Sequence, residues 1–435
     1  MRPVIAATLL SALRDRFGEA ARPAETGDEV AGAQPVAVVE PRDTAEVSAL
    51  LSFADAEGLK VLIRGGGAQL DLGFPPAGGD ILLSTRALTR VIDYTANDQT
   101  ITVETGMPLV ALQAALAPAD QWFALDPALP EQATMGGVVS TNASGARRLR
   151  YGGVRDQLLG VQVVLADGTV ARGGGKVVKN VAGYDLPKLY VGALGTLGVV
   201  TAVSLRVYPR PSTSRTVIVR CAALGPLSAA AGRVLGATLT PTSLDMLDAR
   251  LTEGDSRYTL AARFESRVDE SVAEQSATCV ALMSAEDVEV VSLSGDEEAS
   301  LWRDMDARAV VVSHEREARI KVSVPPTEIA GWLAAFEALT GAQDVVLAGW
   351  RAHMGHGLVF ARMVADAPSL VHVLERLRAE AMERRGSLVL ESARPDLAER
   401  FDVWGPSPAL ELMRRVKTRF DPNNTLNPGR FIGRL

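Results

Sequence analysis

Between residues 130 and 209 the chain alternates short glycine clusters with runs of β-branched residues, such as 161–165 and 199–203. Glycine is used where the backbone needs a positive φ or where a ligand must approach the main chain closely. One cluster predicts a turn, whereas several clusters beside strand-like runs favour a backbone that follows a large ligand. A loop-rich β domain with many turns is the alternative interpretation.

A further glycine cluster upstream points to the kind of ligand. Gly65, Gly66 and Gly67 directly follow Arg64 and the strand-like run 60–63. Successive glycine N–H groups after a strand form an anion-binding nest, which is a common way to hold a diphosphate. The pattern is not the dinucleotide fingerprint GxGxxG opening a helix, because residues 68–73 lead into two prolines. Arg64 and the three glycines are expected to belong to the cofactor site, and Ala68 and Gln69 are expected to continue the diphosphate loop.

Composition narrows the possible classes of protein. The 435 residues allow two or three domains. The net charge of −7, with no polybasic run, argues against a nucleic-acid partner. Two cysteines are too few for an iron–sulfur cluster held by this chain alone and make no disulfide framework, so a cytoplasmic location is expected. No stretch approaches the ~20 apolar residues of a membrane span, so membrane association would come through partners.

The order of elements predicts an α+β fold. A strand at 36–39, a helix that follows Asp43 and ends at Gly58, and the strand at 60–63 precede the glycine loop. The dipeptide Asp167-Gly168 predicts a hairpin. Strands and helices do not alternate with a regular βαβ period, which disfavours a doubly wound sheet. The prolines and hydroxyl residues of 208–214 mark a boundary, and no internal repeat is evident.

The motifs together resemble one flavoprotein family. The stretches RGGGAQLDLG, ATMGGVVSTNASG, VVKNVAGYDLPKL, GALGTLGVVTAV and FDPNNTLNPGRF are similar, in order and spacing, to those of the vanillyl-alcohol oxidase/p-cresol methylhydroxylase (PCMH) family. Within that family the sequence most resembles the FAD-binding E subunits of bacterial glycolate oxidases. The resemblance covers most of residues 35–210 and 400–435, and the middle of the chain matches only loosely.

The resemblance implies a domain plan. An N-terminal helix and linker (1–34), preferred over a signal peptide, would precede a two-part PCMH-type FAD-binding domain (35–210). An α+β cap or substrate domain (211–395) would follow. A C-terminal segment (396–435) would pack back on the flavin side.

The resemblance also extends the predicted cofactor site beyond the glycine loop. FAD would be bound non-covalently, because Ala68 stands where some members carry the histidine that is bonded to the flavin. Lys179 is expected at the pyrimidine edge of the flavin, with a solvated loop lysine as the alternative. The other implied cofactor residues are Pro130, Thr134, Met135, Gly136, Gly137, Ser140, Asn142, Ser144, Gly145, Gly198, Val199, Val200 and Asn427.

Candidate catalytic residues lie in the stretch 352–360. Relatives in this family carry a GHxGDGNxH-type motif whose two histidines help to bind a metal ion. Here His353 matches the first histidine, Phe360 replaces the second, and His356 replaces an acidic residue. Two nitrogens without a third ligand make a poor metal site, so no metal is expected. His353 or His356 is the candidate base and Arg351 a candidate carboxylate binder, as are Arg319 and Lys321; packing and surface roles are the alternatives.

Three functions stay open. The first is an FAD-binding subunit of a glycolate oxidase-like complex, which works with a homologous catalytic subunit and an iron–sulfur subunit. In that complex it would oxidise a small 2-hydroxy acid such as glycolate or D-lactate, or hold FAD for assembly without catalysis. The second is a self-sufficient, metal-independent FAD-linked 2-hydroxyacid dehydrogenase. The third, a binding module that has lost flavin, is disfavoured by the intact glycine motifs.

Overall fold

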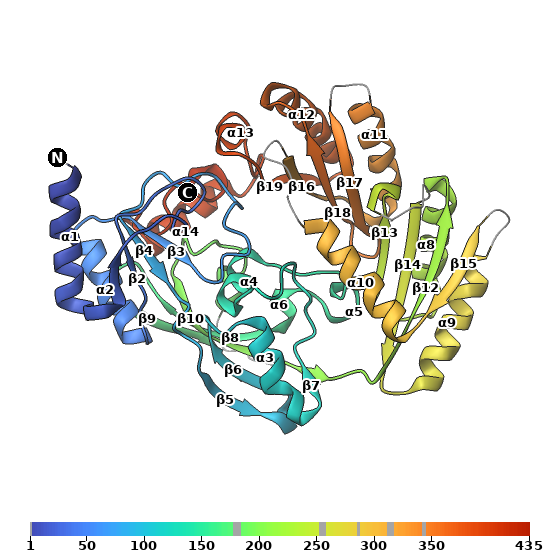
Figure 1. Ribbon diagram of the computed structural model, residues 1–435, viewed down its shortest axis with the longest axis horizontal. Coiled ribbons are helices and arrows are strands. Elements are labelled where there is room, and N and C mark those ends of the chain that lie inside the picture. Colours follow the sequence, from blue (N-terminus) through green and yellow to red (C-terminus); the bar gives the residue numbers. More distant parts are fainter. Residues whose placement is uncertain (1, 177–183, 252–257, 285–287, 311–316, 342–344) are drawn as a thin grey trace. The chain divides into compact units, whose positions relative to one another are not determined.

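The computed structural model describes residues 2–176, 184–251, 258–284, 288–310, 317–341 and 345–435 (Figure 1). The chain forms two compact units. Unit 1 comprises residues 1–144, 153–209 and 406–435, and unit 2 comprises residues 145–152 and 210–405. Both units combine helices and sheets, which confirms the predicted α+β class. The chain leaves unit 1 after residue 209 and returns to it after residue 405.

Parallel strands at the start of unit 1 bring two loops to one edge of a sheet. The strand order is β1 (Ala21–Pro23), β2 (Ala37–Val39), β4 (Ile81–Ser84) and β3 (Val61–Arg64), with β2, β4 and β3 parallel. Helix α2 (Thr44–Ala56) links β2 to β3, and its buried Leu50 and Leu51 share a core with Leu13 of α1 (Arg2–Phe17). Arg64 and Ser84 are register partners, so the segments that follow these strands start side by side.

A second, antiparallel sheet completes unit 1. Its order is β5 (Val91–Thr95), β6 (Thr100–Glu104), β10 (Val199–Arg206), β8 (Leu158–Val164) and β9 (Val170–Gly174). Gly168, at φ +87°, makes the predicted turn between β8 and β9. Helices α3 (Leu109–Leu116) and α4 (Met135–Thr141) share a core with this sheet. Short elements complete the unit: α6 (Val154–Gln157), α7 (Pro187–Tyr190), and the pair β7 (Gln121–Trp122) and β11 (Tyr208–Pro209).

Of the C-terminal segment expected at 396–435, residues 406–435 belong to unit 1 and residues 396–405 to unit 2. After α14 (Leu410–Phe420) the chain runs beside β3, where the Val61 N–H donates to the Thr425 carbonyl at 2.8 Å. The buried Lys417 ammonium donates to the carbonyls of Thr196 and Leu426 at 2.9 and 3.1 Å, and to Asp421 at 2.6 Å. These bonds fix the tail against β3 and against the loop that precedes β10.

Unit 2 is built on one eight-stranded sheet whose strands are all antiparallel to their neighbours. The order is β15-β12-β14-β13-β17-β18-β16-β19. The strands are β12 (Thr213–Cys221), β13 (Ser243–Leu247), β14 (Tyr258–Ser266), β15 (Glu289–Leu293), β16 (Glu317–Ser323), β17 (Val346–His353), β18 (Leu358–Val364) and β19 (Ser387–Ser392). The helices are α5 (Arg148–Tyr151), α8 (Leu224–Gly236), α9 (Asp269–Met283), α10 (Gly295–Val310), α11 (Ile329–Gly341), α12 (Ala367–Glu383) and α13 (Pro395–Arg400).

This sheet contains a structural repeat that the sequence did not reveal. The first half runs β12-α8-β13-β14-α9-β15, and the second runs β16-α11-β17-β18-α12-β19 in the same order of strands and helices. The halves meet where β13 pairs with β17, which we call the central junction. Sequence analysis found no internal repeat, because this repeat lies in the order and pairing of the elements and not in a repeated run of residues.

Alternation along the strands separates two faces of this sheet. Trp350 and Ala352 of β17 are buried on one side, and Trp350 donates to Glu337 of α11 at 3.3 Å. Arg351 and His353, which alternate with these two residues, lie on the other face, where α10 supplies Trp302 to a small core with Leu247.

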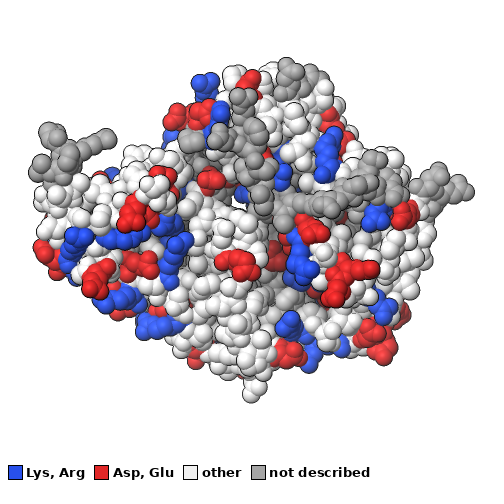
Figure 2. All heavy atoms as spheres, in the orientation of Figure 1, with Lys and Arg blue, Asp and Glu red and all other residues white. Residues whose placement is uncertain are grey.

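On the surface shown in Figure 2, acidic and basic side chains are interspersed and neither sign forms a large patch. Within the described residues, no helix has the length and apolar character needed to cross a bilayer.

Candidate cofactor and catalytic sites

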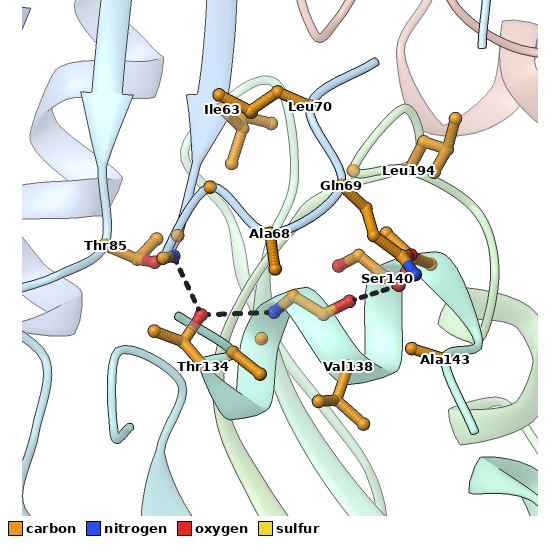
Figure 3. A pocket seen from close by; sticks show the side chains of 18 of the residues that line it. Ile63, Ala68, Gln69, Leu70, Thr85, Thr134, Val138, Ser140, Ala143 and Leu194 are labelled. Atoms are coloured by element: carbon orange, nitrogen blue, oxygen red, sulfur yellow. Dashed lines mark hydrogen bonds between the residues drawn. The ribbon is translucent and has the colours of Figure 1, made fainter. Parts of the chain in front are cut away.

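An open cavity with an empty volume of about 880 Å³ lies within unit 1, between the edge of the first sheet and α4. Its wall comes from four stretches of chain within 63–70, 127–143, 194–200 and 427–430, together with Thr85 (Figure 3). The wall is mostly apolar and glycine-rich.

The glycine loop needs its glycines for close approach. A Cβ on Gly66 would lie 1.7 Å from the carbonyl oxygen of Gln132, and a Cβ on Gly65 would lie 2.4 Å from the Thr134 hydroxyl. Gly67 has φ +95°, a conformation that side chains disfavour. The Thr134 hydroxyl accepts from the Gly66 N–H at 3.2 Å and the Gly137 N–H at 3.4 Å (Figure 3). Thr134 therefore joins the loop to the first turn of α4.

The opposite wall comes from the later strand and the tail. A Cβ on Gly198 would lie 2.6 Å from a methyl group of Val163, so this wall has no room for a side chain there. The side-chain amide of Asn427 donates to the Leu194 carbonyl at 2.6 Å and accepts from the Ile63 N–H at 3.0 Å. Asn427 thereby links β3 to the loop that precedes β10.

The structure brings most of the sequence-predicted cofactor residues to this cavity. Those that line it are Gly65, Gly66, Gly67, Ala68, Gln69, Thr134, Gly136, Gly137, Ser140, Gly198, Val199, Val200 and Asn427. Pro130, Met135, Asn142, Ser144 and Gly145 are not part of the wall, and Gly145 belongs to unit 2. Arg64 is buried and forms an ion pair with Asp28 at 2.7 Å. It therefore anchors the start of the loop and does not line the cavity. Lys179 lies outside the described residues.

Several lining residues were missed by sequence reasoning. They include Thr85, Pro127, Ala128, Gln132, Leu194, Gly195 and Arg430. Thr85 carried a usable signal, because it follows a strand parallel to β3 and such strand ends meet at one edge. Arg430 stood in the tail motif LNPGRF, but nothing in a single sequence indicates that its side chain enters a cavity.

The cavity fits FAD. The backbone N–H groups of Gly67, Ala68 and Gln69 have no hydrogen-bond partner among the described residues, which suits a diphosphate. Figure 3 shows Ala68 and Gln69 above α4, with the Gln69 side chain extended toward Ser140 in this view. The part of the wall that the structure describes contains no His, Cys or Tyr that could form a bond to the flavin. These residues therefore fit a cofactor that is held without a covalent link.

The candidate catalytic residues of unit 2 gather at the central junction. His353 of β17 pairs in register with Asp245 of β13, and its Nδ1 lies 2.8 Å from a carboxylate oxygen of Asp245. The Arg351 guanidinium donates to the other oxygen of Asp245 at 2.7 Å and to Asp306 at 2.6 Å. Burial alone would raise the pKa of Asp245, but its electrostatic interactions and hydrogen bonds with His353 and Arg351 outweigh that effect and lower the pKa to about 2. Asp245 is therefore a carboxylate at neutral pH.

His356 lies beside this group in an unusual environment. Its ring stacks on that of His353 with 5.3 Å between the centroids. Both ring nitrogens are buried and have no hydrogen-bond partner within the described chain. Burial, together with the electrostatic influence of His353 and Arg148, lowers the pKa of His356 to about 3, so the ring is neutral at neutral pH. Unsatisfied buried polar atoms are rare in proteins and commonly mark a water or ligand position.

Nothing in the described ranges assembles a metal centre at this place. Phe360 packs edge-on against His353 at 5.3 Å where relatives are expected to carry the second histidine. No group of three or more His, Cys, Asp or Glu side chains among the described residues is arranged to hold a metal ion. The junction therefore consists of two histidines, one carboxylate and one arginine.

Comparison with known families finds two domain models in the chain. A model described as "FAD binding domain" matches residues 35–174, and one described as "FAD linked oxidases, C-terminal domain" matches residues 403–431. These matches fall mostly on unit 1 and include the glycine loop, α4 and the tail. They establish FAD as the cofactor of this chain.

Curated relatives align over nearly the whole length. D-lactate dehydrogenase of Archaeoglobus fulgidus is 30% identical, over 93% of each chain. Glycolate oxidase subunit GlcD of Bacillus subtilis is 27% identical, over 92% of this chain and 89% of the relative. D-2-hydroxyglutarate dehydrogenase of Xanthomonas citri is 28% identical, over 92% and 89%.

Solved structures share the fold at lower identity. p-Cresol methylhydroxylase with substrate bound aligns with a TM-score of 0.78 at 14% identity, over 98% of this chain and 96% of that chain. Alkyldihydroxyacetonephosphate synthase aligns with a TM-score of 0.71 at 16% identity, over 92% and 78%. The expected PCMH-type fold is thereby confirmed.

Proposed function

Because this chain belongs to the family of FAD-linked oxidoreductases, we propose that it oxidises a small 2-hydroxy acid to the 2-oxo acid. Three relatives whose names specify glycolate, D-lactate or D-2-hydroxyglutarate chemistry align over more than nine tenths of the chain. The observation that carries the proposal is the Asp245–His353 pair, since it supplies a base of the kind this oxidation needs.

The reaction removes two electrons and two protons from the carbinol group. Bound FAD supplies the acceptor for the electron pair and for the hydrogen on carbon. The hydroxyl proton needs a base, and an Nδ1–H held by the Asp245 carboxylate leaves Nε2 of His353 with a lone pair to accept it. We assign His353 as that base, and His356 as a hydrogen-bonding neighbour, because its low pKa makes it a weak base.

The substrate carboxylate needs a cation, and Arg351 is already engaged by Asp245 and Asp306. We therefore assign Arg351 as a positioning residue for Asp245. Arg319 is also engaged, with Glu391 at 3.3 Å. Lys321 lies on the same sheet face, in register with Phe360 and Arg351, and has no ion-pair partner among the described residues. Lys321 is the proposed carboxylate binder.

The proposal includes a complex. The GlcD relative is named as a subunit, which supports a partnership of this chain with a homologous flavoprotein subunit and an iron–sulfur subunit. An iron–sulfur cluster would lie on the partner, because this chain has two cysteines and both, Cys221 and Cys279, are buried in unit 2. The complex is proposed to be cytoplasmic, with any membrane attachment supplied by partners.

A second candidate is a self-sufficient, metal-independent FAD-linked dehydrogenase. Two of the relatives are named as dehydrogenases and not as subunits, and this chain aligns with about nine tenths of each. A non-catalytic FAD-holding subunit is the remaining alternative.

The deciding experiment is anaerobic reduction of the purified FAD-loaded chain. Addition of glycolate or D-lactate is expected to bleach the flavin absorbance near 450 nm, a property of any oxidised flavin. Bleaching by the chain alone, followed by turnover with a soluble acceptor, supports self-sufficiency; bleaching that turns over only with partners supports the complex. A protein that stays yellow with every 2-hydroxy acid would overturn the catalytic proposal.

Two variants test whether reduction of the flavin by the substrate depends on His353 at the central junction. His353→Gln is expected to reduce the rate of bleaching by roughly 100- to 10,000-fold, the usual contribution of a general base. His372→Gln is the matched control, because His372 is an exposed histidine on α12. Equal rates in the two variants would contradict the assignment of His353 as the base.

A further inference from the structure

The diphosphate loop of unit 1 is held by two arginines from distant parts of the chain. Arg86 follows β4, and Arg430 lies in the C-terminal segment. Between them they bind four carbonyl groups of residues 65–72. We call this segment, with the two guanidinium groups, the clamped loop.

Arg86 holds the first part of the clamped loop. Its Nε donates to the Gly65 carbonyl at 3.2 Å, and its Nη2 donates to the Gly66 carbonyl at 3.0 Å. The side chain is exposed, and no carboxylate of the described residues forms an ion pair with it. A Cβ built on Gly67 would lie 3.9 Å from Nη2, so the charge is close to the third glycine as well. A guanidinium can bind two neighbouring carbonyls at once because its donors form a planar fork.

Arg430 holds the second part. One of its terminal nitrogens donates to the Leu70 carbonyl at 2.5 Å and to the Leu72 carbonyl at 2.6 Å. The residue is 4% exposed, and among the described residues it is the one ionisable residue in the wall of the FAD cavity. Burial lowers the pKa of Arg430 to about 10, which still leaves it charged at neutral pH.

The clamp determines which backbone groups face the ligand. The carbonyls of Gly65, Gly66, Leu70 and Leu72 are bound by arginine, and that of Gln69 accepts from the Leu72 N–H at 3.4 Å, so most acceptors of the loop are occupied and a ligand meets chiefly its N–H donors. Those of Gly67, Ala68 and Gln69 have no partner in the described chain, and all three residues line the cavity. Because the rest of the wall formed by the described residues is uncharged, nothing else among them balances a diphosphate, which carries about two negative charges.

We propose that Arg86 and Arg430 are positioning residues for the FAD diphosphate. They orient the N–H groups of residues 67–69 toward the phosphates and supply the positive charge that the cavity wall otherwise lacks. This role concerns the cofactor and does not depend on which substrate is oxidised.

The test measures FAD affinity without substrate. Apoprotein is titrated with FAD, flavin fluorescence gives the Kd, and the titration is repeated at several salt concentrations. Arg86→Met is expected to raise the Kd roughly tenfold and to flatten its dependence on salt. Arg86→Lys should recover only part of the affinity, because an ammonium cannot bind two carbonyls as a planar fork. Arg430→Lys should raise the Kd by roughly 10- to 100-fold.

The matched control is Arg42→Met, which removes an exposed arginine of unit 1 paired with Glu46. It is expected to keep the wild-type Kd and salt dependence. An Arg86→Met variant with the wild-type Kd and salt dependence would overturn the proposal. So would a raised Kd with an unchanged salt dependence and a lower apoprotein melting temperature, because that result indicates a purely structural role. If Arg430→Lys does not fold, the two Arg86 variants decide the question.

Discussion

Asp245 and His353 are 108 residues apart in sequence, yet they face each other across the central junction with 2.8 Å between carboxylate oxygen and Nδ1. Asp245 lies on β13 and His353 on β17, the two strands at which the halves of the sheet meet. The junction of a structural repeat therefore creates a carboxylate–histidine pair that neither half contains by itself. Arg351, two residues before His353, donates to the same carboxylate.

Loss of the Asp245 carboxylate should destabilise unit 2. Asp245→Asn leaves the buried Arg351 without its main counter-charge, so we expect the free energy of unfolding to fall by about 3–5 kcal/mol. Asp306→Asn removes a partner whose side chain is 50% exposed, and should cost less than about 1 kcal/mol. Urea unfolding followed by circular dichroism measures both. Equal effects of the two variants would contradict the account of the junction.

The stability of the protein should depend on pH through His356. The folded-state pKa of about 3 lies below the ordinary value of 6.5, so between these values the unfolded chain binds a proton that the folded chain does not. His356 therefore costs stability as pH falls from 6.5 toward 3, by at most a few kcal/mol. His356→Leu should flatten the curve of unfolding free energy against pH in this window. The exposed His372→Gln variant should follow the wild-type curve, and an identical curve for His356→Leu would refute the prediction.

A methyl group at the second loop glycine should damage the FAD site. In Gly66→Ala the added Cβ would meet the Gln132 carbonyl at 1.7 Å, so the loop must move away from α4. Overpacking of this kind is expected to weaken FAD binding by roughly 10- to 100-fold. Gly78→Ala, whose Cβ would have only an ordinary contact with Lys60, should retain its flavin. The ratio of absorbance at 450 and 280 nm after desalting measures how much flavin each variant retains.

The tail should be required for the same site. Asn427→Ala removes the bonds to the Ile63 N–H and the Leu194 carbonyl, and both groups would be left unpaired beside the cavity. We expect about 1–3 kcal/mol lower stability and weaker FAD binding. Asn423→Ala removes an exposed bond to Asp55 and serves as the control. Thermal melting with and without added FAD makes the comparison, and a flavin-induced shift unchanged by Asn427→Ala would argue against a role for the tail.

The flavin should be released on denaturation. Ala68 stands at the position of the bonded histidine in some relatives, and the described part of the cavity wall contains no His, Cys or Tyr. Acid precipitation is therefore expected to leave all of the yellow colour in the supernatant. Flavin that stays with the precipitate would show a covalent link and would require an attachment residue outside the described wall.

Local patterns predicted the features that depend on neighbours in sequence. The glycine loop, the cap of α2 at Asp43 and the turn at Gly168 follow from backbone preferences over a few residues, and sequence analysis located them. The α+β class followed from the irregular succession of strand-like and helix-like runs. The family resemblance added Thr134, Gly198 and Asn427, which line the cavity as expected.

Only the tertiary structure decided which side chains share a site. The pairing of β13 with β17 gives His353 its carboxylate and engages Arg351, which sequence analysis had offered as a free carboxylate binder. The clamped loop needs Arg86 and Arg430, which stand 344 positions apart in the chain. Such contacts arise from strand order and from the return of the tail, and a single sequence carries no local pattern that encodes either. The sequence therefore determined the cofactor loop, and the fold determined what surrounds it.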